Sequence, residues 1–350
     1  MAAVKPVRAA IIGLSANATT AWASTAHLPC FTCPSGKERF EIVALCNSSV
    51  AAAEAAIAAY GFDSRSTAAY GDPAALAADA NVDLVICNTR VDRHYETSLP
   101  SIQAGKDVYI EWPIASNTSD IARLVQAAKK SGSKVLVGLQ GRWARPVEKL
   151  TEILDSGVIG KVLSCDVRAF GGTNDREILP QGLAYFAQKE VGGNVITIGV
   201  GHGHLPSSSR THQGASLSFT YRRGQPFPST PALTWSIHCS RGEVRLVSPG
   251  TTNLHAATYG DDDEPVTIQV HDFATGAVTD VPWEWSAEQL EVPGRARSVQ
   301  RALYAYADWK RGVSGVKDDV WVEIDDAAAR AAQIDNWLGE FRASTEEGTD

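Results

Sequence analysis

The stretch Val7-Arg-Ala-Ala-Ile-Ile-Gly-Leu-Ser-Ala-Asn17 decides the fold of this chain. Its first half has the apolar composition of a buried strand, and Gly13 marks the turn that follows. In a doubly wound α/β fold, a glycine at this place lets the main chain approach a pyrophosphate, whose charge the next main-chain N–H groups bind. The stretch therefore predicts a strand over Val7–Gly13 and a dinucleotide site in the turn after it.

The glycine motif in this turn is incomplete. Of the G-x-G-x-x-G pattern typical of dinucleotide turns, only Gly13 is present; Ser15 takes the second position, and Ala18 or Ala21 the third. Taken alone, the motif fits a strand-to-helix turn that binds nothing equally well. The candidate cofactor-binding residues in the turn are Gly13, Leu14, Ser15, Ala16 and Asn17.

Short β-rich runs alternate with helical patterns over residues 1–145, as in parallel βαβ units. Helices are expected over Ala51–Tyr60 and Ser119–Lys130. Besides Val7–Gly13, the expected strands are Phe40–Cys46, Val82–Asn88, Asp107–Glu111 and Lys134–Gly138. The sequence thus predicts an α/β fold class, with an N-terminal Rossmann domain built on a doubly wound parallel sheet over residues 1–145.

Residues 146–350 have a different pattern. Helices are expected over Val147–Asp155, Ser298–Lys310 and Ile324–Phe341. The expected strands, separated by Gly, Pro and Asp turns, are Lys161–Phe170, Ala215–Tyr221, Ala232–His238, Glu243–Val247 and Val266–Val270. We expect an α+β domain with an open, mostly antiparallel sheet for substrate binding and oligomerisation, and a C-terminal helix that packs back on the first domain.

Composition excludes several function classes. The chain has 40 acidic and 32 basic side chains, a net charge of −8, which argues against direct nucleic-acid binding. Residues 9–36 contain no charged side chain, but polar residues and prolines interrupt them, so neither a membrane span nor a signal peptide is expected. We therefore expect a cytoplasmic protein with a small-molecule substrate.

The end of the second strand bears on the choice of cofactor. Asn47, Ser48 and Ser49 occupy the place where an Asp or Glu would hold the ribose hydroxyls of NAD. These neutral side chains would not repel a 2′-phosphate, so NADP is favoured, with NAD as the alternative.

Five segments occur in an order that resembles a known family. They are Gly13-Leu-Ser-Ala16, Trp22 with Ala26-His-Leu-Pro29, Asn88-Thr-Arg-Val-Asp-Arg-His-Tyr95, Ala104-Gly-Lys-Asp-Val-Tyr-Ile-Glu-Trp-Pro113 and Gly138-Leu-Gln-Gly-Arg142. Together they resemble the glucose-fructose oxidoreductase/inositol dehydrogenase (Gfo/Idh/MocA) family, in the fungal branch that also contains the galactose-pathway repressor of yeasts. The resemblance implies a Rossmann domain, a sheet domain that faces the nicotinamide and often dimerises, and hydride transfer on sugars or polyols.

The chain departs from this family at its catalytic signature. In the family's enzymes Glu-Lys-Pro follows the fifth strand, and the lysine contacts the cofactor and takes part in proton transfer. Here Glu111 and Pro113 keep the flanks, but Trp112 replaces the lysine. An indole can stack on a ring but cannot exchange a proton. Glu111 and Trp112 are therefore candidates for a catalytic site whose chemistry differs from that of the family, and Glu111, Trp112 and Pro113 are candidates for cofactor binding.

The family's second landmark, a glycine pair followed by an Asp and a His, is also altered. After Gly192-Gly193, Thr197 replaces the Asp, and His202 matches the His with a shift of one residue. We expect His202 to be the acid/base group, because a histidine titrates near neutral pH, and His204 to be the second candidate. Metal binding by these histidines, or packing at a helix start, are the open alternatives, and no metal is expected.

Other candidates follow the fourth and sixth strands. The family's loop after the fourth strand approaches the nicotinamide; it corresponds here to Asn88, Thr89, Arg90 and His94. Gln140 and Arg142 are candidates for orienting substrate oxygens. Tyr185 would line the same pocket, or be half-buried with a packing role only.

Cys30 and Cys33 have the C-x-x-C spacing of a redox or metal pair, but no second pair completes a zinc site.

Two function classes remain. The first is an NAD(P)-dependent oxidoreductase acting on a sugar-like or secondary-metabolite carbonyl or hydroxyl group, with a homodimer through the C-terminal sheet. The second is a non-catalytic dinucleotide-binding regulator, similar to the yeast repressor and acting through a protein partner. The enzyme is slightly favoured because Glu111, Pro113, His94 and His202 preserve a pocket.

Overall fold

The computed structural model describes residues 5–18, 20–171, 179, 181–188, 191–192, 197, 214–224, 227–252, 254, 265–316 and 321–346. The chain divides into two compact units. The first comprises Met1–Leu139, Ala184–Gly201 and Val299–Asp350, and the second Gln140–Leu183 and His202–Ser298. Among the described residues each unit contains one six-stranded sheet. The domain limits expected from the sequence, 1–145 and 146–350, stay a prediction.

The sheet of the first unit is parallel, with strand order β3-β2-β1-β4-β5-β6. This is the order of the doubly wound dinucleotide fold, so the predicted Rossmann fold is confirmed. β4, β5 and β6 are buried along their whole length, as the continuous apolar runs of a sheet covered on both faces require. The strands are β1 (Val7–Ile12), β2 (Phe40–Cys46), β3 (Ala68–Tyr70), β4 (Leu84–Cys87), β5 (Asp107–Glu111) and β6 (Val135–Gly138).

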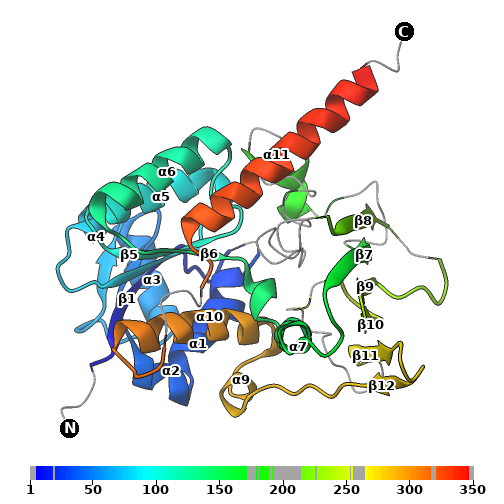
Figure 1. The fold of residues 1–350 in the computed structure, drawn as a ribbon. Coiled ribbons are helices and arrows are strands. Elements are labelled where there is room, and N and C mark those ends of the chain that lie inside the picture. The colour runs from blue at the N-terminus through cyan, green and yellow to red at the C-terminus, as the bar shows by residue number, and fades with distance from the viewer. Residues whose placement is uncertain are drawn as a thin grey trace. The chain divides into compact units, whose positions relative to one another are not determined.

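Helices cover both faces of this sheet, with α5 and α6 on one side and α1 and α2 on the other (Figure 1). Their ends follow local capping chemistry. Ser49 caps α3, and α6 is capped by Asn117 and ends at Gly132, whose φ of 77° is left-handed. The helix expected from Ser119 therefore starts one residue earlier. The segments are a π-helical turn η1 (Ala23–His27), α1 (Leu28–Thr32), α2 (Pro34–Arg39), α3 (Val50–Ala59), α4 (Pro73–Ala77), α5 (Val91–Gln103) and α6 (Thr118–Ser131).

The sheet of the second unit has the order β12-β11-β10-β9-β7-β8. Only the pairing of β7 with β8 is parallel in the described residues, so the predicted mostly antiparallel sheet is confirmed. Its elements are η2 (Gln140–Trp143), α7 (Arg145–Asp155), β7 (Val162–Gly171), β8 (Ser216–Arg223), β9 (Leu233–Cys239), β10 (Gly242–Ser248), β11 (Thr267–Asp272), β12 (Val278–Asp280) and α9 (Ala287–Leu290). A further 3-10 segment, η3 (Gln181–Ala187), crosses the division between the units.

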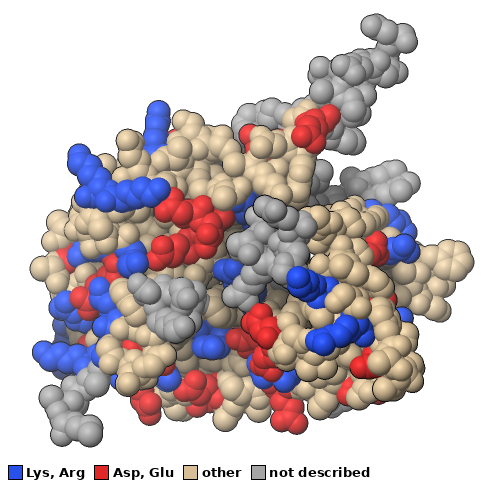
Figure 2. Space-filling model, viewed as in Figure 1, with Lys and Arg blue, Asp and Glu red and all other residues tan. Residues whose placement is uncertain are grey.

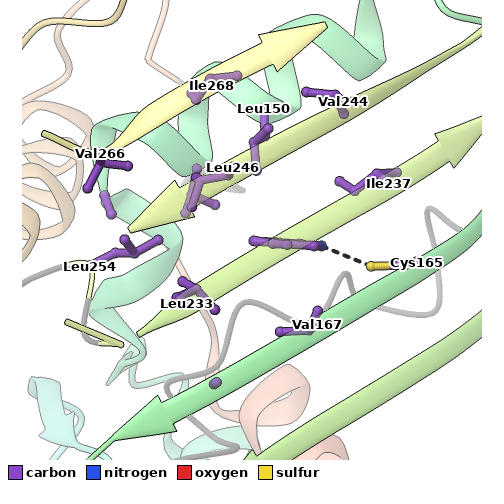
Figure 3. Close-up of a cluster of buried hydrophobic side chains, with 14 of the residues drawn as sticks. Leu150, Cys165, Val167, Leu233, Ile237, Val244, Leu246, Leu254, Val266 and Ile268 are labelled. Carbon is purple, nitrogen blue, oxygen red and sulfur yellow. Dashed lines mark hydrogen bonds between the residues drawn. The ribbon is translucent and has the colours of Figure 1, made fainter. Parts of the chain in front are cut away.

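Alternation of side chains places the core of the second unit on one face of its sheet. Every second residue of β9 and β10 is buried, and Leu150 of α7 lies over them (Figure 3). Within this core the Trp235 indole donates a hydrogen bond of 2.9 Å to the Cys165 thiol sulfur. One apolar face against one helix is the arrangement that antiparallel sheets commonly adopt.

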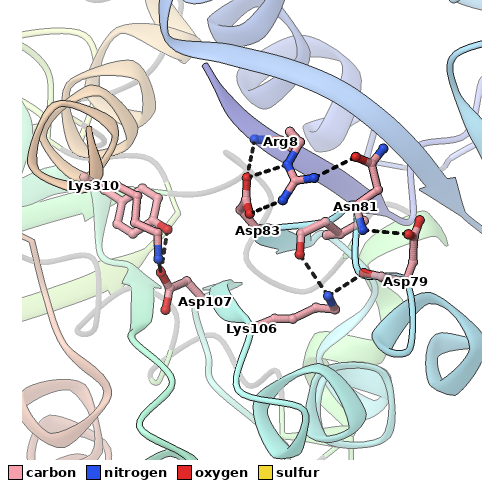
Figure 4. Close-up of polar contacts among 9 residues, drawn as sticks. Arg8, Asp79, Asn81, Asp83, Lys106, Asp107 and Lys310 are labelled. Carbon is pink, nitrogen blue, oxygen red and sulfur yellow. Dashed lines mark hydrogen bonds and ion pairs between the residues drawn. The ribbon is translucent and has the colours of Figure 1, made fainter. Parts of the chain in front are cut away.

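The last helices, α10 (Gly294–Lys310) and α11 (Ile324–Glu346), contribute to the first unit. Tyr306 and Lys310 of α10 both donate to the buried carboxylate of Asp107 at 2.7 Å, at the start of β5 (Figure 4). α11 contacts α6 and β6. The Asp107 carboxylate thus links the start of β5 to α10, which is distant in the sequence. A buried charge requires several hydrogen-bond donors, and α10 supplies two of them.

Two observations concern the helices and the surface charge of the described residues. None of the helices in the described part of the chain has the length and hydropathy needed to cross a membrane. On the face in Figure 2, acidic side chains are interspersed among the basic ones. That distribution agrees with the net acidic composition.

The core of the second unit should depend on Leu246, whose side chain is fully buried on β10. Leu246→Ala should lower the free energy of unfolding by about 2–5 kcal/mol, through lost burial and a residual cavity. The control Leu290→Ala, at a side chain 60% exposed, should change it by less than about 0.5 kcal/mol. Urea denaturation measures both; equal losses would show that Leu246 is not part of the core.

Candidate active site at the carboxyl edge of the parallel sheet

Gly13 brings the ends of β1 and β4 into close contact. Its φ is +91°, and its N–H donates to the Cys46 carbonyl at 3.0 Å. A Cβ atom here would lie 2.9 Å from the Asn88 carbonyl oxygen and 3.0 Å from the Asn88 carbonyl carbon. Only glycine fits both the left-handed conformation and this approach. The carboxyl ends of β1, β2 and β4 therefore meet at Gly13, where no side chain separates their main chains.

The residues after Gly13 form a loop. Leu14 is buried, whereas Ala16 and Asn17 are exposed, and the first helical segment begins at Ala23. Ser15 Oγ accepts a hydrogen bond from the Asn17 N–H at 3.2 Å. Such local bonds compete with a helix, which explains why the expected strand-to-helix turn contains a longer loop.

Asn47 connects the second strand to this loop. Its amide donates to the Leu14 carbonyl at 2.9 Å and to the Ala52 carbonyl at 3.3 Å. Ser49 accepts the Ala52 N–H at 3.1 Å as the cap of α3, and Ser48 is exposed. Positions 47–49 carry no acidic side chain, and Asn47 and Ser49 each have a structural bond in addition to any binding role.

Asn88 has a polar side chain that the protein does not satisfy. Its amide nitrogen and oxygen are both buried, and neither has a hydrogen-bond partner among the described residues. Leaving such groups unpaired costs about 1–3 kcal/mol, so they usually have a ligand or water. Thr89 lies beside it, with its hydroxyl 3.4 Å from that of Thr97.

His94 lies between the loop after β4 and the loop after β5 and contacts the main chain of both. Its Nδ1 lies 2.8 Å from the Pro113 carbonyl oxygen and its Nε2 2.8 Å from the Thr89 carbonyl oxygen. Burial lowers the pKa of this imidazole from its ordinary 6.5, although the two carbonyls act in the opposite direction. The desolvation cost is larger, so the neutral ring is favoured. Both nitrogens face main chain, and His94 joins the β4 and β5 loops.

Glu111, at the end of β5, is buried among donors from the first helical segment. Its Oε1 accepts from the Trp22 indole at 3.0 Å and lies 2.5 Å from His27 Nε2. His27 is fully buried and packs edge-on against Tyr109, with 5.2 Å between ring centroids. This carboxylate therefore fixes the loop after Gly13 to the end of the fifth strand.

Trp112, in the place of the family's lysine, is only 5% exposed. Its indole N–H donates to the Thr197 carbonyl oxygen at 3.0 Å. Four positions further along the loop, Ser116 Oγ donates to the Val191 carbonyl at 2.7 Å. The loop after β5 thus holds the main chain at Val191 and at Thr197.

The remaining candidates are distributed between the units. Tyr185 lies with its ring under the Arg90 guanidinium, 5.5 Å from carbon to centroid, and burial raises its pKa, an effect that Arg90 opposes. Arg90 also pairs with Asp92 and lowers the pKa of that carboxyl. Gln140, buried, and Arg142, exposed, lie in η2 of the second unit. His202 and His204 lie outside the described residues.

The structure brings together most candidates of the first unit. The edge of the sheet unites Gly13, Asn47, Asn88 and the loop after β5 through the bonds above. The sequence analysis assigned no role to Trp22 or His27. Two signals were available: His27 is the only titratable side chain besides cysteine thiols in the charge-free residues 9–36, and a glutamate that ends a buried strand needs donors.

No metal cluster accompanies this edge within the described ranges, where no three His, Cys, Asp or Glu side chains are placed to hold an ion. Cys30 donates to the Ala26 carbonyl, and Cys33 lies 3.1 Å from the Tyr304 hydroxyl. Both thiols of the C-x-x-C pair thus contact other groups of the first unit.

The neutral state of His94 should appear in the pH dependence of stability. Its native pKa is below 6.5 and its unfolded pKa is near that value. At a pH between these two pKa values, the unfolded chain binds the proton and the folded chain does not. The free energy of unfolding should therefore fall as pH decreases below about 6.5. His94→Asn should flatten this dependence in urea denaturation from pH 5 to 7.5; an unchanged slope would assign it to other groups.

Comparison with known proteins shows the family of this chain. Residues 7–139 match the model of the GFO_IDH_MocA oxidoreductase family, with its NAD-binding Rossmann fold. Dehydrogenase aclE of Aspergillus oryzae is 37% identical over 265 residues, which are 75% of this chain and 70% of that protein.

Two solved structures share the fold. A super-repressor mutant of Gal80p from Saccharomyces cerevisiae has a TM-score of 0.78 at 17% identity, over 95% of each chain. KijD10, a 3-ketoreductase from Actinomadura kijaniata in complex with NADP, has a TM-score of 0.64 at 18% identity, over 95% of this chain and 96% of that one. With the sequence match to the dehydrogenase, the family is clear: the chain belongs to the Gfo/Idh/MocA family of NAD(P)-binding oxidoreductases.

Proposed function

We propose that this protein is an NADP-dependent oxidoreductase that transfers a hydride to or from a carbonyl or hydroxyl group of a sugar-like or secondary-metabolite substrate. The observation that carries the proposal is the bare main chain at Gly13 beside Asn88, whose buried amide has no partner in the described part of the protein. A side chain at position 13 would collide with the Asn88 main chain and disturb this edge of the sheet. An unpaired amide at the same edge is ready to bond a polar ligand.

The residues at this edge fit a dinucleotide. The nicotinamide would supply hydride transfer. Main-chain N–H groups of the loop after Gly13 would bind the pyrophosphate, and exposed Ser48 would face the adenosine ribose. The absence of a carboxylate at Asn47–Ser49 favours the 2′-phosphate of NADP. KijD10, of the same fold, is known in complex with NADP.

Proton transfer must come from a residue other than Trp112, because its N–H is donated to the Thr197 carbonyl and does not titrate. We assign it to His202, with His204 as the second candidate. In the oxidation direction His202 would take the hydroxyl proton from the substrate. Tyr185, Thr197, Gln140 and Arg142 are proposed to orient the substrate.

A non-catalytic regulator is the second candidate, and one observation favours it. Trp112 is buried where the family's enzymes have an ammonium, and the chain shares its fold with Gal80p. In this case the dinucleotide would control binding to a protein partner. The 37% identity to a dehydrogenase favours the enzyme. A homodimer through the second sheet is part of either proposal.

Cofactor binding should depend on Gly13. Gly13→Ala places a Cβ atom 2.9 Å from the Asn88 carbonyl oxygen, so NADPH affinity should fall at least about 10-fold, or 1.4 kcal/mol. Gly276→Ala is the matched control: its φ is +70°, but nothing lies within 4 Å of the added Cβ. Cofactor fluorescence titration measures both, and equal affinities in the two variants would place the dinucleotide elsewhere.

The same titration compares NADPH with NADH. Wild type should prefer NADPH, and Ser48→Asp should weaken NADPH binding while sparing NADH, because a carboxylate repels the 2′-phosphate. Ser48→Asn is the neutral control. Wild-type preference for NADH would refute the assignment of NADP.

Catalysis should depend on His202. In an NADPH oxidation assay over sugars, ketones and imines, His202→Asn should retain cofactor affinity and lose about 10²–10⁴-fold in turnover, the usual contribution of a positioned acid or base. Equal turnover would remove His202 as the proton donor. A wild type that binds NADPH but oxidises it with no member of the panel would favour the regulator.

A further inference from the structure

Three contacts connect the loop after β5 to the segment around the glycine pair. The Trp112 indole donates to the Thr197 carbonyl at 3.0 Å, and the Ser116 hydroxyl donates to the Val191 carbonyl at 2.7 Å. At Gly192, with φ +79°, a Cβ atom would lie 2.2 Å from Ser116 Cα. The donors come from one loop and the acceptors from another, about 75 to 85 residues away in the sequence.

We infer that Trp112 is a positioning residue: its N–H fixes Thr197 against the loop after β5, so that a structural bond stands where the family's enzymes have the lysine's chemistry. A tryptophan suits this task because its indole is rigid, donates only one hydrogen bond and cannot lose that proton near neutral pH. Burial to 5% exposure protects the bond from water. The bond does not depend on catalysis; its effect on turnover rests on the proposed function.

The contacts on both sides of Trp112 give a physical reason for a tryptophan between Glu111 and Pro113. Glu111 is held by Trp22 and His27 immediately before Trp112, so the start of the loop is fixed on one side. Ser116 and Gly192 fix the other end by close packing. Trp112 lies between these two anchors, and its N–H holds the Thr197 carbonyl at 3.0 Å.

Hydrogen–deuterium exchange of the cofactor-free protein tests this inference. The Gln188 N–H is bonded to the Tyr185 carbonyl and the Val191 N–H to the Gln188 carbonyl, so both amides report on the held segment. Trp112→Phe keeps the ring and removes the donor. Both amides should then exchange about 3- to 10-fold faster, the factor expected for one lost neutral hydrogen bond. Ser116→Ala should accelerate the same amides.

Trp283→Phe is the matched control, because the Trp283 indole also donates to a main-chain carbonyl, that of Val266, at 2.8 Å in the second unit. It should leave Gln188 and Val191 unchanged. Unchanged exchange of both amides in Trp112→Phe would overturn the inference, and so would equal acceleration across all strands of the first sheet, which would indicate general destabilisation.

A kinetic measurement then separates positioning from proton transfer. On any active substrate, Trp112→Phe should lower kcat about 10-fold or more through displacement of Thr197, which the proposed function assigns to substrate orientation, with unchanged NADPH affinity and an unchanged pH profile. A shifted pH profile would contradict a pure positioning role. An inactive wild type would refute the proposed function but leave the exchange result valid, so the two failures are distinguishable.

Discussion

The buried carboxylate of Glu111 is the constraint on which the rest of the site depends. It lies at the end of β5 and is stabilised by the Trp22 indole and the His27 imidazole, which come from the charge-free N-terminal residues. Removing the donors would leave a carboxylate in an apolar environment, at a cost of several kcal/mol. The loop after Gly13, the end of β5 and the first helical segment are therefore held as one body. Glycine at position 13 then places the third partner, the Asn88 main chain, against them.

This rigid edge explains how the family's framework tolerates a lost lysine. The flanking residues Glu111 and Pro113 have main-chain or buried partners that do not require the ammonium. Replacement of the lysine by Trp112 removes a mobile charge and adds a fixed bond to Thr197. Oxidoreductase and regulator share every one of these features, since each needs a bound dinucleotide. The two proposed functions differ in whether a titratable group transfers a proton to or from the substrate, and His202 is the residue to which we assign that transfer.

Much of the fold could be predicted from the sequence. Strands such as Asp107–Glu111 are apolar and β-branched, and their limits agree with the structure. β3 (Ala68–Tyr70) was missed, because three residues rich in alanine have little β-propensity and pair only through tertiary contact. The parallel pairing of β7 with β8 also has no local signal, since it depends on partners more than fifty residues apart.

The candidate site could be predicted less completely. Gly13 was found because its conformation and its role both require glycine. The bonds of Asn47 to Leu14, His94 to Pro113 and Trp112 to Thr197 could not be found, because residue type does not reveal a main-chain partner 19 to 85 residues away. Sequence identified the polar residues of the edge, while the structure shows which of their atoms are already bonded. Asn88 is the clearest result, with an amide that no described residue satisfies.

A crystal structure of the protein with NADP tests directly the proposal that this edge binds a dinucleotide with a 2′-phosphate. The account predicts the pyrophosphate over the loop after Gly13, the 2′-phosphate beside Ser48, and a hydrogen bond from the ligand to the Asn88 amide. A cofactor bound elsewhere, or density at this edge with Asn88 still unpaired and no contact at Ser48, would contradict it.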